Sequence, residues 1–473
     1  MMLTLADAIE ALTTVRPAHA NMVITEAAID SRQAIPGSLF VAIPGEHLDG
    51  HNFVADAFRR GASFALIQSD IPETYRTIDL RSSSKLFDQP QTYDTPVCLR
   101  VENSLVALQQ IARFWRRKLD LRVVGVTGSV GKSTTKEVIA EVLEQRYCTL
   151  KSPGNMNNEI GLPLTILRLG SGYERAVLEM GFYMPGEIAF LCEIALPVIG
   201  VVTNIGTVHA ERAGSQEAIF RGKSELVQAL PPGGVAILNL DDPLVKKMAD
   251  LTGARVFFYG LDPAADLWAD EVESLGLEGI RFSLHYQSET LHVHVPMIGL
   301  HSVHTALRAA AVGLVDGLTW QEILDGLRQG HAQLRLSVIR TDSGALLVDD
   351  TYNASPESML AAINLLAQLE GHKVAVLGDM LELGPYEKQG HEMVGVRVAE
   401  VADALVTVGI RGHMIASAAA QAGLKPKKIT EFEDSDQAIA HLRKSLTKDD
   451  VVLVKGSHAI RMDRVAAALE VPE

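Results

Sequence analysis

The sequence predicts an α/β protein of three domains: a small α/β domain, a central domain with a mostly parallel sheet, and a C-terminal Rossmann-like domain. Apolar, β-branched runs alternate with helix-compatible segments from residue 123 onward and again from residue 345 onward. Continuous apolar strands of this kind are buried on both faces by helices. The 473 residues suffice for roughly two to four domains. Changes in this alternation along the chain predict domains at 1–105, 106–332 and 333–473.

Composition excludes several classes of protein. The net charge of −15 disfavours a nucleic-acid partner, and the 47% hydrophobic content supports real cores. Three cysteines without a C-x-x-C spacing indicate reduced thiols. No apolar run approaches the roughly 18 residues of a membrane span, and the first residues do not resemble a signal peptide. We expect a cytoplasmic monomer without a membrane span.

The first domain is expected to be rich in turns over 35–45 and to end in an exposed polar loop over 81–85. A helix is predicted over 104–119, because its apolar residues recur on one face. Its basic residues are predicted to be mostly solvated, with a phosphate contact as the alternative: Arg113, Arg116, Arg117 and Lys118.

The strands of the other two domains follow from their apolar runs. They are predicted over 123–126, 176–180, 198–203 and 235–238 in the central domain, and over 345–348, 373–377, 404–408 and 451–454 in the third. Ligands of open α/β sheets bind beyond the carboxyl ends of the strands. In the third domain these ends carry Asp349, Asp350, Gly378, Asp379, Gly409, Lys455 and Gly456.

A glycine-rich turn directly follows the first central strand. It carries the pattern T-G-x-x-G-K-S from Thr127 to Ser133. Glycines let backbone N–H groups close on phosphate oxygens, and the following helix N-terminus adds partial positive charge. Lys132 would reach the β- and γ-phosphates, and the Ser133 hydroxyl would bind Mg²⁺. The sequence therefore predicts a nucleotide site with contacts from Thr127, Gly128, Ser129, Val130, Gly131, Lys132, Ser133 and Thr134.

Other polar residues follow the central strands. Glu179 is a candidate second Mg²⁺ ligand, with a helix cap or ion pair as the alternative. Asn239, Asp241 and Asp242 suit recognition of a base or ribose. The amides around Asn157 could serve turn chemistry only, and His209 taken alone would more often be structural.

Together these residues resemble one family, the Mur ligases, which are ATP-dependent amide ligases that build the peptide of bacterial peptidoglycan. The glycine-rich turn, the stretch 154–163 (G-N-x-N-N-x-x-G-x-P), the T-N-I element at 203–205 and the N-x-D-D turn at 239–242 all match its motifs. The resemblance implies that Asn239 and Asp241 contact adenosine. It also implies a second metal near His209 and near Lys223, a lysine carbamylated by CO₂.

The first domain is similar to a UDP-binding domain of the family. The resemblance rests on 30–51 and implies substrate contacts from Ser31, Arg32, Gly50, His51, Asn157 and Asn158. Arg32 would offer a forked donor to a pyrophosphate or carboxylate. Its alternative role is a surface ion pair, for example with Asp30.

The third domain is similar to the family members that add the final dipeptide, through 350–359, 377–384 and His391. These imply an acyl-phosphate reaction joining D-alanyl-D-alanine to UDP-N-acetylmuramoyl-tripeptide, with ATP and two Mg²⁺ ions. The implied catalytic residues are Lys132, His209, Lys223, Asp350 and Asn353, and Arg335 would contact ATP. The alternatives are a ligase that adds the third residue, a folylpolyglutamate synthase or, less favoured, a nucleotide-dependent switch.

The sequence also departs from the family pattern. Ser302 and Thr305 replace the asparagines usual at the start of one helix, and Leu334 replaces the glycine usual before Arg335. Hydrogen bonding around 302–305 must therefore differ, and neither residue is assigned to the nucleotide.

Overall fold

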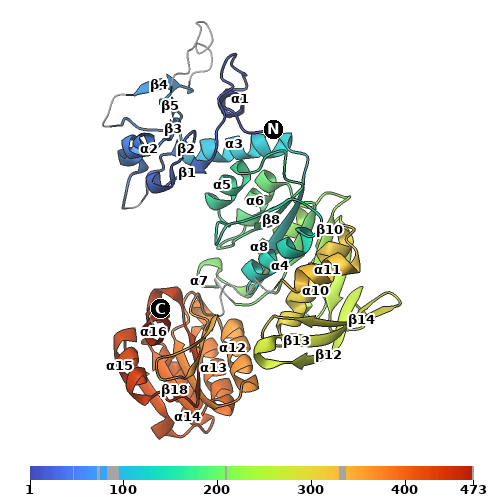
Figure 1. The fold of residues 1–473 in the computed structure, drawn as a ribbon, viewed down its shortest axis with the longest axis vertical. Helices are drawn as coiled ribbons and strands as arrows, with labels where there is room; N and C mark the ends of the chain where they lie inside the picture. Colours follow the sequence, from blue (N-terminus) through green and yellow to red (C-terminus); the bar gives the residue numbers. More distant parts are fainter. Residues whose placement is uncertain (46, 72–74, 82–94, 208–209, 330–336, 471–473) are drawn as a thin grey trace. The chain divides into compact units, whose positions relative to one another are not determined.

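The computed structural model describes residues 1–45, 47–71, 75–81, 95–207, 210–329 and 337–470. These residues form three sheets of five, nine and six strands (Figure 1). The predicted α/β class with parallel sheets is confirmed. The chain also divides into two compact units: Met1–Gly125 with Tyr147–Gly181 and Glu187–Ile199, and Val126–Arg146 with Phe182–Gly186 and Gly200–Glu473.

The first sheet is parallel throughout and has the strand order β1-β2-β3-β5-β4. Strands β2 and β3 at its centre are fully buried, and Phe40 and Phe64 are among the largest buried side chains. The strands are β1 (Ala27–Ala28), β2 (Leu39–Val41), β3 (Phe64–Ile67), β4 (Arg76–Asp79) and β5 (Val97–Arg100), with helices α1 (Leu5–Thr13) and α2 (Val54–Arg59). Of the predicted loop over 81–85, the part after residue 81 lies outside the described residues.

The predicted helix at 104–119 is confirmed as α3 (Ser104–Lys118), with Asn103 capping its start through Val106 N–H. The prediction was wrong for Arg116, which is only 5% exposed. Its guanidinium donates to the carbonyl oxygens of Ala195, Leu119 and Leu121 at 2.8–3.1 Å. The helical pattern shows where Arg116 faces but not which carbonyls from other segments converge on it.

The nine-stranded sheet has the order β14-β13-β12-β11-β10-β9-β6-β8-β7. The four predicted strands are confirmed within one or two residues at each end as β6 (Arg122–Thr127), β8 (Arg175–Glu179), β9 (Ile199–Val202) and β10 (Val235–Asn239). The strands that were not predicted are β7 (Thr149–Lys151), β11 (Arg255–Gly260), β12 (Leu267–Ser274), β13 (Ile280–Tyr286) and β14 (Glu289–Val295). The last three form an antiparallel ribbon whose partly exposed strands lack a continuous apolar run.

Helices accompany this sheet in both units. They are α4 (Lys132–Leu143), α5 (Gly161–Leu167), α6 (Glu187–Ala195), α7 (Ala210–Ala213), α8 (Gln216–Gln228), α9 (Pro243–Lys247), α10 (Ser302–Val315) and α11 (Trp320–Leu327). Among the described residues, no helix is long and apolar enough to cross a membrane.

The third sheet has the order β15-β16-β20-β17-β18-β19 and is parallel except for β15. Alternate residues of β17 enter two separate cores: Ala375 and Leu377 pack into one, Val374 and Val376 into the other. Figure 1 shows α12 and α13 on one side of this sheet and α15 and α16 on the other. Helices therefore cover both faces, which confirms the Rossmann-like prediction.

The elements of this domain agree with the four predicted strands and add two at the edges. The strands are β15 (Ser337–Arg340), β16 (Leu346–Asp349), β17 (His372–Gly378), β18 (Ala404–Val408), β19 (Ile429–Phe432) and β20 (Asp450–Lys455). The helices are α12 (Pro356–Gln368), α13 (Glu387–Val401), α14 (Gly412–Gln421), α15 (Ser435–Ser445) and α16 (Met462–Leu469). The edge strands β15 and β19 are only partly buried, so they lack the apolar signal of the central strands.

Candidate active site

The predicted glycine-rich loop connects β6 to α4, as its pattern requires. Gly131 stands at the N-cap of α4 with φ +82°, and Gly128 has φ +147°. A Cβ atom at Gly128 would overlap the hydroxyl of Thr203. Glycine is therefore required at 128 because of close packing and at 131 because of the left-handed backbone conformation.

The segment after β9 holds this loop in place. The Thr203 hydroxyl donates to the Val130 carbonyl at 2.7 Å, and Val130 N–H donates to Asn204 Oδ1 at 2.9 Å. Ser129 N–H donates to the Asn204 carbonyl at 3.0 Å. Because the N–H groups of Ser129 and Val130 already bond to Asn204, backbone donors for a phosphate would come from the residues that follow.

Two lysines from different elements converge on one carbonyl of the loop. Lys132, the first residue of α4, donates to the carbonyl of Gly128 at 2.9 Å and to that of Ser129 at 3.2 Å. Lys223 of α8 donates to the same Gly128 carbonyl at 2.9 Å. The structure thus brings together two residues that lie 91 positions apart in the sequence (223 minus 132).

Lys223 is fully buried, and its ammonium lies 4.8 Å from the centre of the Phe182 ring. Among the described residues no carboxylate lies within its contacts. Burial, and secondarily the charge of Lys132, lowers the pKa of Lys223 well below its ordinary value. Burial thus shifts Lys223 toward the uncharged amine relative to an exposed lysine, and the uncharged amine is the nucleophilic form.

The predicted adenosine residues form a compact hydrogen-bonded group after β10. Asn239 Oδ1 accepts from Asp241 N–H, and Asp241 accepts from Leu261 N–H at 2.8 Å and from His304 Nε2 at 2.8 Å. Asp242 caps α9 through two N–H groups, and its second oxygen accepts from Ile205 N–H at 2.9 Å. Asp242 thereby ties the end of β10 to the segment that holds the loop.

Sequence reasoning missed Arg308 of α10, which is 5% exposed. Its terminal nitrogens lie 3.9 Å from the position that a Cβ atom would take at Gly131. The only sequence signal was an arginine within the run Ala306–Ala311, on a helix that otherwise reads as core. Arg308 is the second cationic side chain, besides Lys223, that tertiary packing brings to the loop.

Within the other unit, Glu179 ends β8 and is 2% exposed. Its Oε1 accepts from Asn157 Nδ2 at 2.8 Å, and its N–H donates to Ser152 Oγ at 3.1 Å. Asn158 Oδ1 accepts from Gly161 N–H at the start of α5. Asn157 therefore orients the candidate metal ligand, whereas the Asn158 side chain serves local turn chemistry.

The candidate UDP-binding residues have partners inside their own domain. Asp49 bonds to His51 Nδ1 at 2.6 Å, and His51 Nε2 accepts the N–H groups of Gln68 and Ser69. The 2%-exposed His51 ring thus uses both nitrogens within the protein, and His51 would act on a ligand only by positioning the end of β3. Gly50 leaves no room for a Cβ atom, which would lie 2.7 Å from Ile43 N.

Ser31 and Arg32 sit on a short 3₁₀ turn beside α2. Ser31 Oγ donates to Asp56 at 2.8 Å, and Arg32 forms a forked pair with Asp30 at 2.7–3.1 Å. This is the ion pair that the sequence suggested as the alternative role of Arg32. The Arg32 side chain is nevertheless 80% exposed and can exchange this partner for another.

In the third domain, polar residues gather at the strand ends as predicted. Lys455, which ends β20 and is 2% exposed, pairs with Asp350 at 2.7 Å and donates to the Asn353 carbonyl at 2.8 Å. His391 Nε2 accepts from Met380 N–H at 3.1 Å, and Asp379 accepts from Gly412 N–H at 2.7 Å. Burial raises the pKa of Asp379 above its ordinary value and outweighs the hydrogen bond from Gly412 N–H, which lowers it. Lys455 thus orders the loop that carries Asp350, Tyr352 and Asn353.

Two candidate residues, His209 and Arg335, lie outside the described residues. In the part of the chain that is described, no group of three or more His, Cys, Asp or Glu side chains could hold a metal ion. The predicted metal ligands Ser133, Glu179, His209 and Lys223 stay a prediction.

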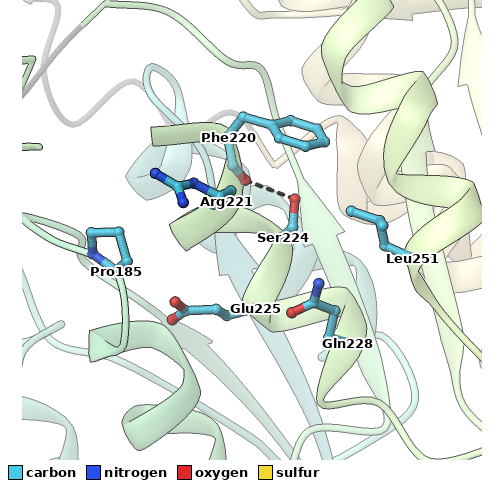
Figure 2. A pocket seen from close by; sticks show the side chains of 7 residues that line it. All are labelled: Pro185, Phe220, Arg221, Ser224, Glu225, Gln228 and Leu251. Carbon is cyan, nitrogen blue, oxygen red and sulfur yellow. Dashed lines mark hydrogen bonds between the residues drawn. The ribbon is translucent and has the colours of Figure 1, made fainter. Parts of the chain in front are cut away.

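A surface groove lies on the exposed side of α8 (Figure 2). Glu225 accepts from Gly186 N–H at its edge, and Ser224 Oγ donates to the Phe220 carbonyl. The groove is lined by Pro185, Phe220, Arg221, Ser224, Glu225, Gln228 and Leu251. Lys223 is not part of this lining, so its neighbours Arg221 and Glu225 belong to a surface distinct from the glycine-rich loop.

Three segments of the chain match models of one protein family. Residues 23–116 match the Mur ligase family catalytic domain, 126–313 the Mur ligase middle domain, and 334–458 the Mur ligase glutamate ligase domain. A Bacillus subtilis protein named UDP-N-acetylmuramoyl-tripeptide–D-alanyl-D-alanine ligase is 34% identical over 97% of this chain and 95% of its own length.

Two crystal structures share the whole fold. A MurF structure from Acinetobacter baumannii has a TM-score of 0.84 and 31% identity and covers 99% of both chains. MurF ligase from Thermotoga maritima in complex with ADP has a TM-score of 0.77 and 30% identity, covering 97% of this chain and 98% of its own. Because three models of this family match the chain and full-length relatives are more than 30% identical to it, the chain belongs to the Mur ligase family.

Proposed function

We propose that this chain is an ATP-dependent amide ligase that adds D-alanyl-D-alanine to UDP-N-acetylmuramoyl-tripeptide, in peptidoglycan synthesis. The observation that carries the ligase chemistry is the convergence of Lys132 and Lys223 on the Gly128 carbonyl of the glycine-rich loop. The names of the relatives that match nearly the whole chain support the choice of substrates, as do the motifs of the third domain that resemble the dipeptide-adding ligases.

Amide formation from a carboxylate requires activation. The terminal carboxylate of the tripeptide attacks the γ-phosphorus of ATP, an acyl phosphate forms, and the bond to ADP breaks. The amine of D-alanyl-D-alanine then attacks the acyl carbon, loses a proton, and expels inorganic phosphate. Such a reaction depends chiefly on positioning and charge neutralisation.

The residues around the loop fit these demands. Lys132 supplies a charge at the phosphates, the left-handed Gly131 opens the N-terminus of α4 toward them, and Ser133 and Thr134 follow on the first turn. Asn239 and Asp241 would bind adenosine, and Arg335 would reach ATP from the third domain. The loop of Asp350 and Asn353, held by Lys455, would complete the site there.

The group that Lys223 would carry fits its surroundings. A desolvated, neutral amine can attack CO₂, forming a C–N bond and releasing a proton, and this leaves a carbamate anion. The resemblance implies that the carbamate and His209 are Mg²⁺ ligands, and Ser133 and Glu179 are further candidate Mg²⁺ ligands, each on its own unit. Magnesium would neutralise charge on the transferring phosphoryl group.

The remaining assignments concern the whole molecule. We infer domains at 1–105 for the UDP-linked substrate, 106–332 for ATP and 333–473 for completion of the ligase site. Ser31, Arg32, Gly50, His51, Asn157 and Asn158 would support substrate binding, the last four by shaping the backbone or orienting Glu179. We also propose that the chain is a cytoplasmic monomer.

A coupled assay for ADP release tests this function. With UDP-N-acetylmuramoyl-tripeptide, D-alanyl-D-alanine and ATP together, ADP release should depend on all three. Release with the UDP-linked dipeptide and a single diamino acid would instead identify a ligase that adds the third residue. Release with ATP alone, unchanged by either peptide substrate, would refute the ligase and favour a nucleotide-dependent switch.

A further inference from the structure

Helix α10 carries a buried guanidinium that has no ion-pair partner among the described residues. Arg308 donates through Nε to the His304 carbonyl at 2.9 Å and through one terminal nitrogen to Thr305 Oγ1 at 2.9 Å. Its guanidinium carbon lies 5.9 Å from the centre of the Tyr259 ring. Among the described residues its partners are thus a carbonyl, a hydroxyl and an aromatic side chain, and no carboxylate is included.

A buried cation without a counter-charge is costly, since removing an ion from water carries a penalty of several kcal/mol. Burial lowers the pKa of Arg308. The group nevertheless remains a cation, because arginine is not deprotonated in proteins. An anion that binds beside it would recover part of this penalty.

The glycine-rich loop lies where such an anion would bind. Both terminal nitrogens of Arg308 are 3.9 Å from the Cβ position of Gly131, the residue that opens α4. The same turn of α10 reaches the adenosine side of the site, because His304 Nε2 bonds to Asp241. Arg308 and His304, one turn apart on α10, therefore lie beside the phosphate loop and the predicted adenosine carboxylate, respectively.

We propose that Arg308 is a phosphate-binding residue of the nucleotide site, supplying a forked donor to the bound nucleotide from α10. This inference rests on the proposed assignment of ATP to the loop and adds a contact to it. The contact comes from the turn where Ser302 and Thr305 replace the asparagines usual in the family, so this chain binds the nucleotide with its own set of groups there.

The test combines affinity and stability of the full chain. Arg308→Met keeps the length of the side chain and removes its charge. Calorimetry should show the Kd for ADP rising roughly 10- to 100-fold, the loss expected for a charge-assisted forked contact. The Kd for adenosine should change less than twofold. The melting temperature without nucleotide should stay the same or rise, because an uncompensated buried charge has been removed.

Arg308→Lys keeps the charge without the fork and should give an ADP Kd between those of the wild type and Arg308→Met. An ADP Kd within twofold of wild type in Arg308→Met overturns the proposal, whatever happens to stability. So does an equal loss for adenosine and ADP, or an Arg308→Lys variant as weak as Arg308→Met.

Two further variants separate the possible failures. Arg116 is a second buried arginine, but its guanidinium donates to three backbone carbonyls of its own unit. Arg116→Met should lower the melting temperature and leave the ADP Kd unchanged. Lys132→Met should weaken ADP binding. If Lys132→Met leaves the ADP Kd unchanged, the assignment of the loop to ATP fails. If Lys132→Met weakens ADP binding but Arg308→Met does not, only the phosphate-binding role of Arg308 fails.

Discussion

Replacing Asp242 with asparagine isolates one hydrogen bond that supports the nucleotide loop. Asp242 Oδ1 accepts the N–H groups of Leu244 and Val245 at the start of α9, and Oδ2 accepts Ile205 N–H at 2.9 Å. Asparagine caps helices about as well as aspartate. With its oxygen toward α9, however, an asparagine places an NH₂ group against Ile205 N–H.

The free-energy cost of the substitution follows from these contacts. Ile205 is 6% exposed, so water cannot replace the lost acceptor without local opening. A buried donor left without its acceptor costs about 1–3 kcal/mol. If the amide turns over, Ile205 keeps its partner and the cap loses its own, at about 1 kcal/mol. Either arrangement weakens the link between the β10 end and the segment at 203–206.

Native-state hydrogen exchange measures the effect locally. In Asp242→Asn the Ile205 amide should exchange roughly 5- to 150-fold faster, the rate equivalent of 1–3 kcal/mol, and the Michaelis constant for ATP should rise several-fold. Asp434→Asn is a matched control, because the Asp434 carboxylate caps α15 and, among the described residues, accepts hydrogen bonds from Gln437 alone. Unchanged exchange at both Ile205 and the α9 amides would refute the reasoning.

Four other variants test the site and the fold. Lys132→Ala should lower ligase turnover roughly 10²- to 10³-fold, the loss of one charge-assisted contact at about 2–4 kcal/mol, with an unchanged circular dichroism spectrum; near wild-type turnover would remove the loop from the mechanism. Lys223→Ala should lose most activity and regain part of it with short-chain carboxylates, and a mass spectrum should show the CO₂ adduct on the wild type; no rescue and no adduct would contradict the carbamate. Arg32→Lys should raise the Michaelis constant for the UDP-linked peptide several-fold and leave that for ATP unchanged. An equal rise in both constants would contradict this assignment, and an unchanged constant for the UDP-linked peptide would leave Arg32 with only its ion pair to Asp30. Burial raises the pKa of Asp7, but hydrogen bonds from Thr4, Arg16 and Lys118 outweigh it and lower this pKa from 3.8 to about 2. The stability that Asp7 contributes is therefore present above pH 4 and lost as the pH falls toward 2, and in Asp7→Asn the acid titration of the unfolding free energy should lack this component.

Much of the fold was predictable because its signals are local. Strands β6, β8, β9 and β10 are buried on both faces, so each must be a continuous apolar run, and such runs are visible in the sequence. The ribbon β12–β14 was missed because its half-exposed strands have mixed composition. The helix of Arg116 was found, yet the residue was misplaced, since its three acceptors come partly from a segment about 80 positions away.

The sequence by itself determined the α/β class, the phosphate-binding loop between a strand and a helix, and the family motifs. These depend on residues adjacent in the chain, where backbone conformation and periodicity decide the outcome. Only the tertiary structure decided that Lys223 is a desolvated amine on the Gly128 carbonyl, that Lys455 orders the Asp350 loop, and that Arg308 lies beside Gly131. Burial and charge depend on what packs around a side chain, and packing joins residues whose separation in the sequence carries no local signal.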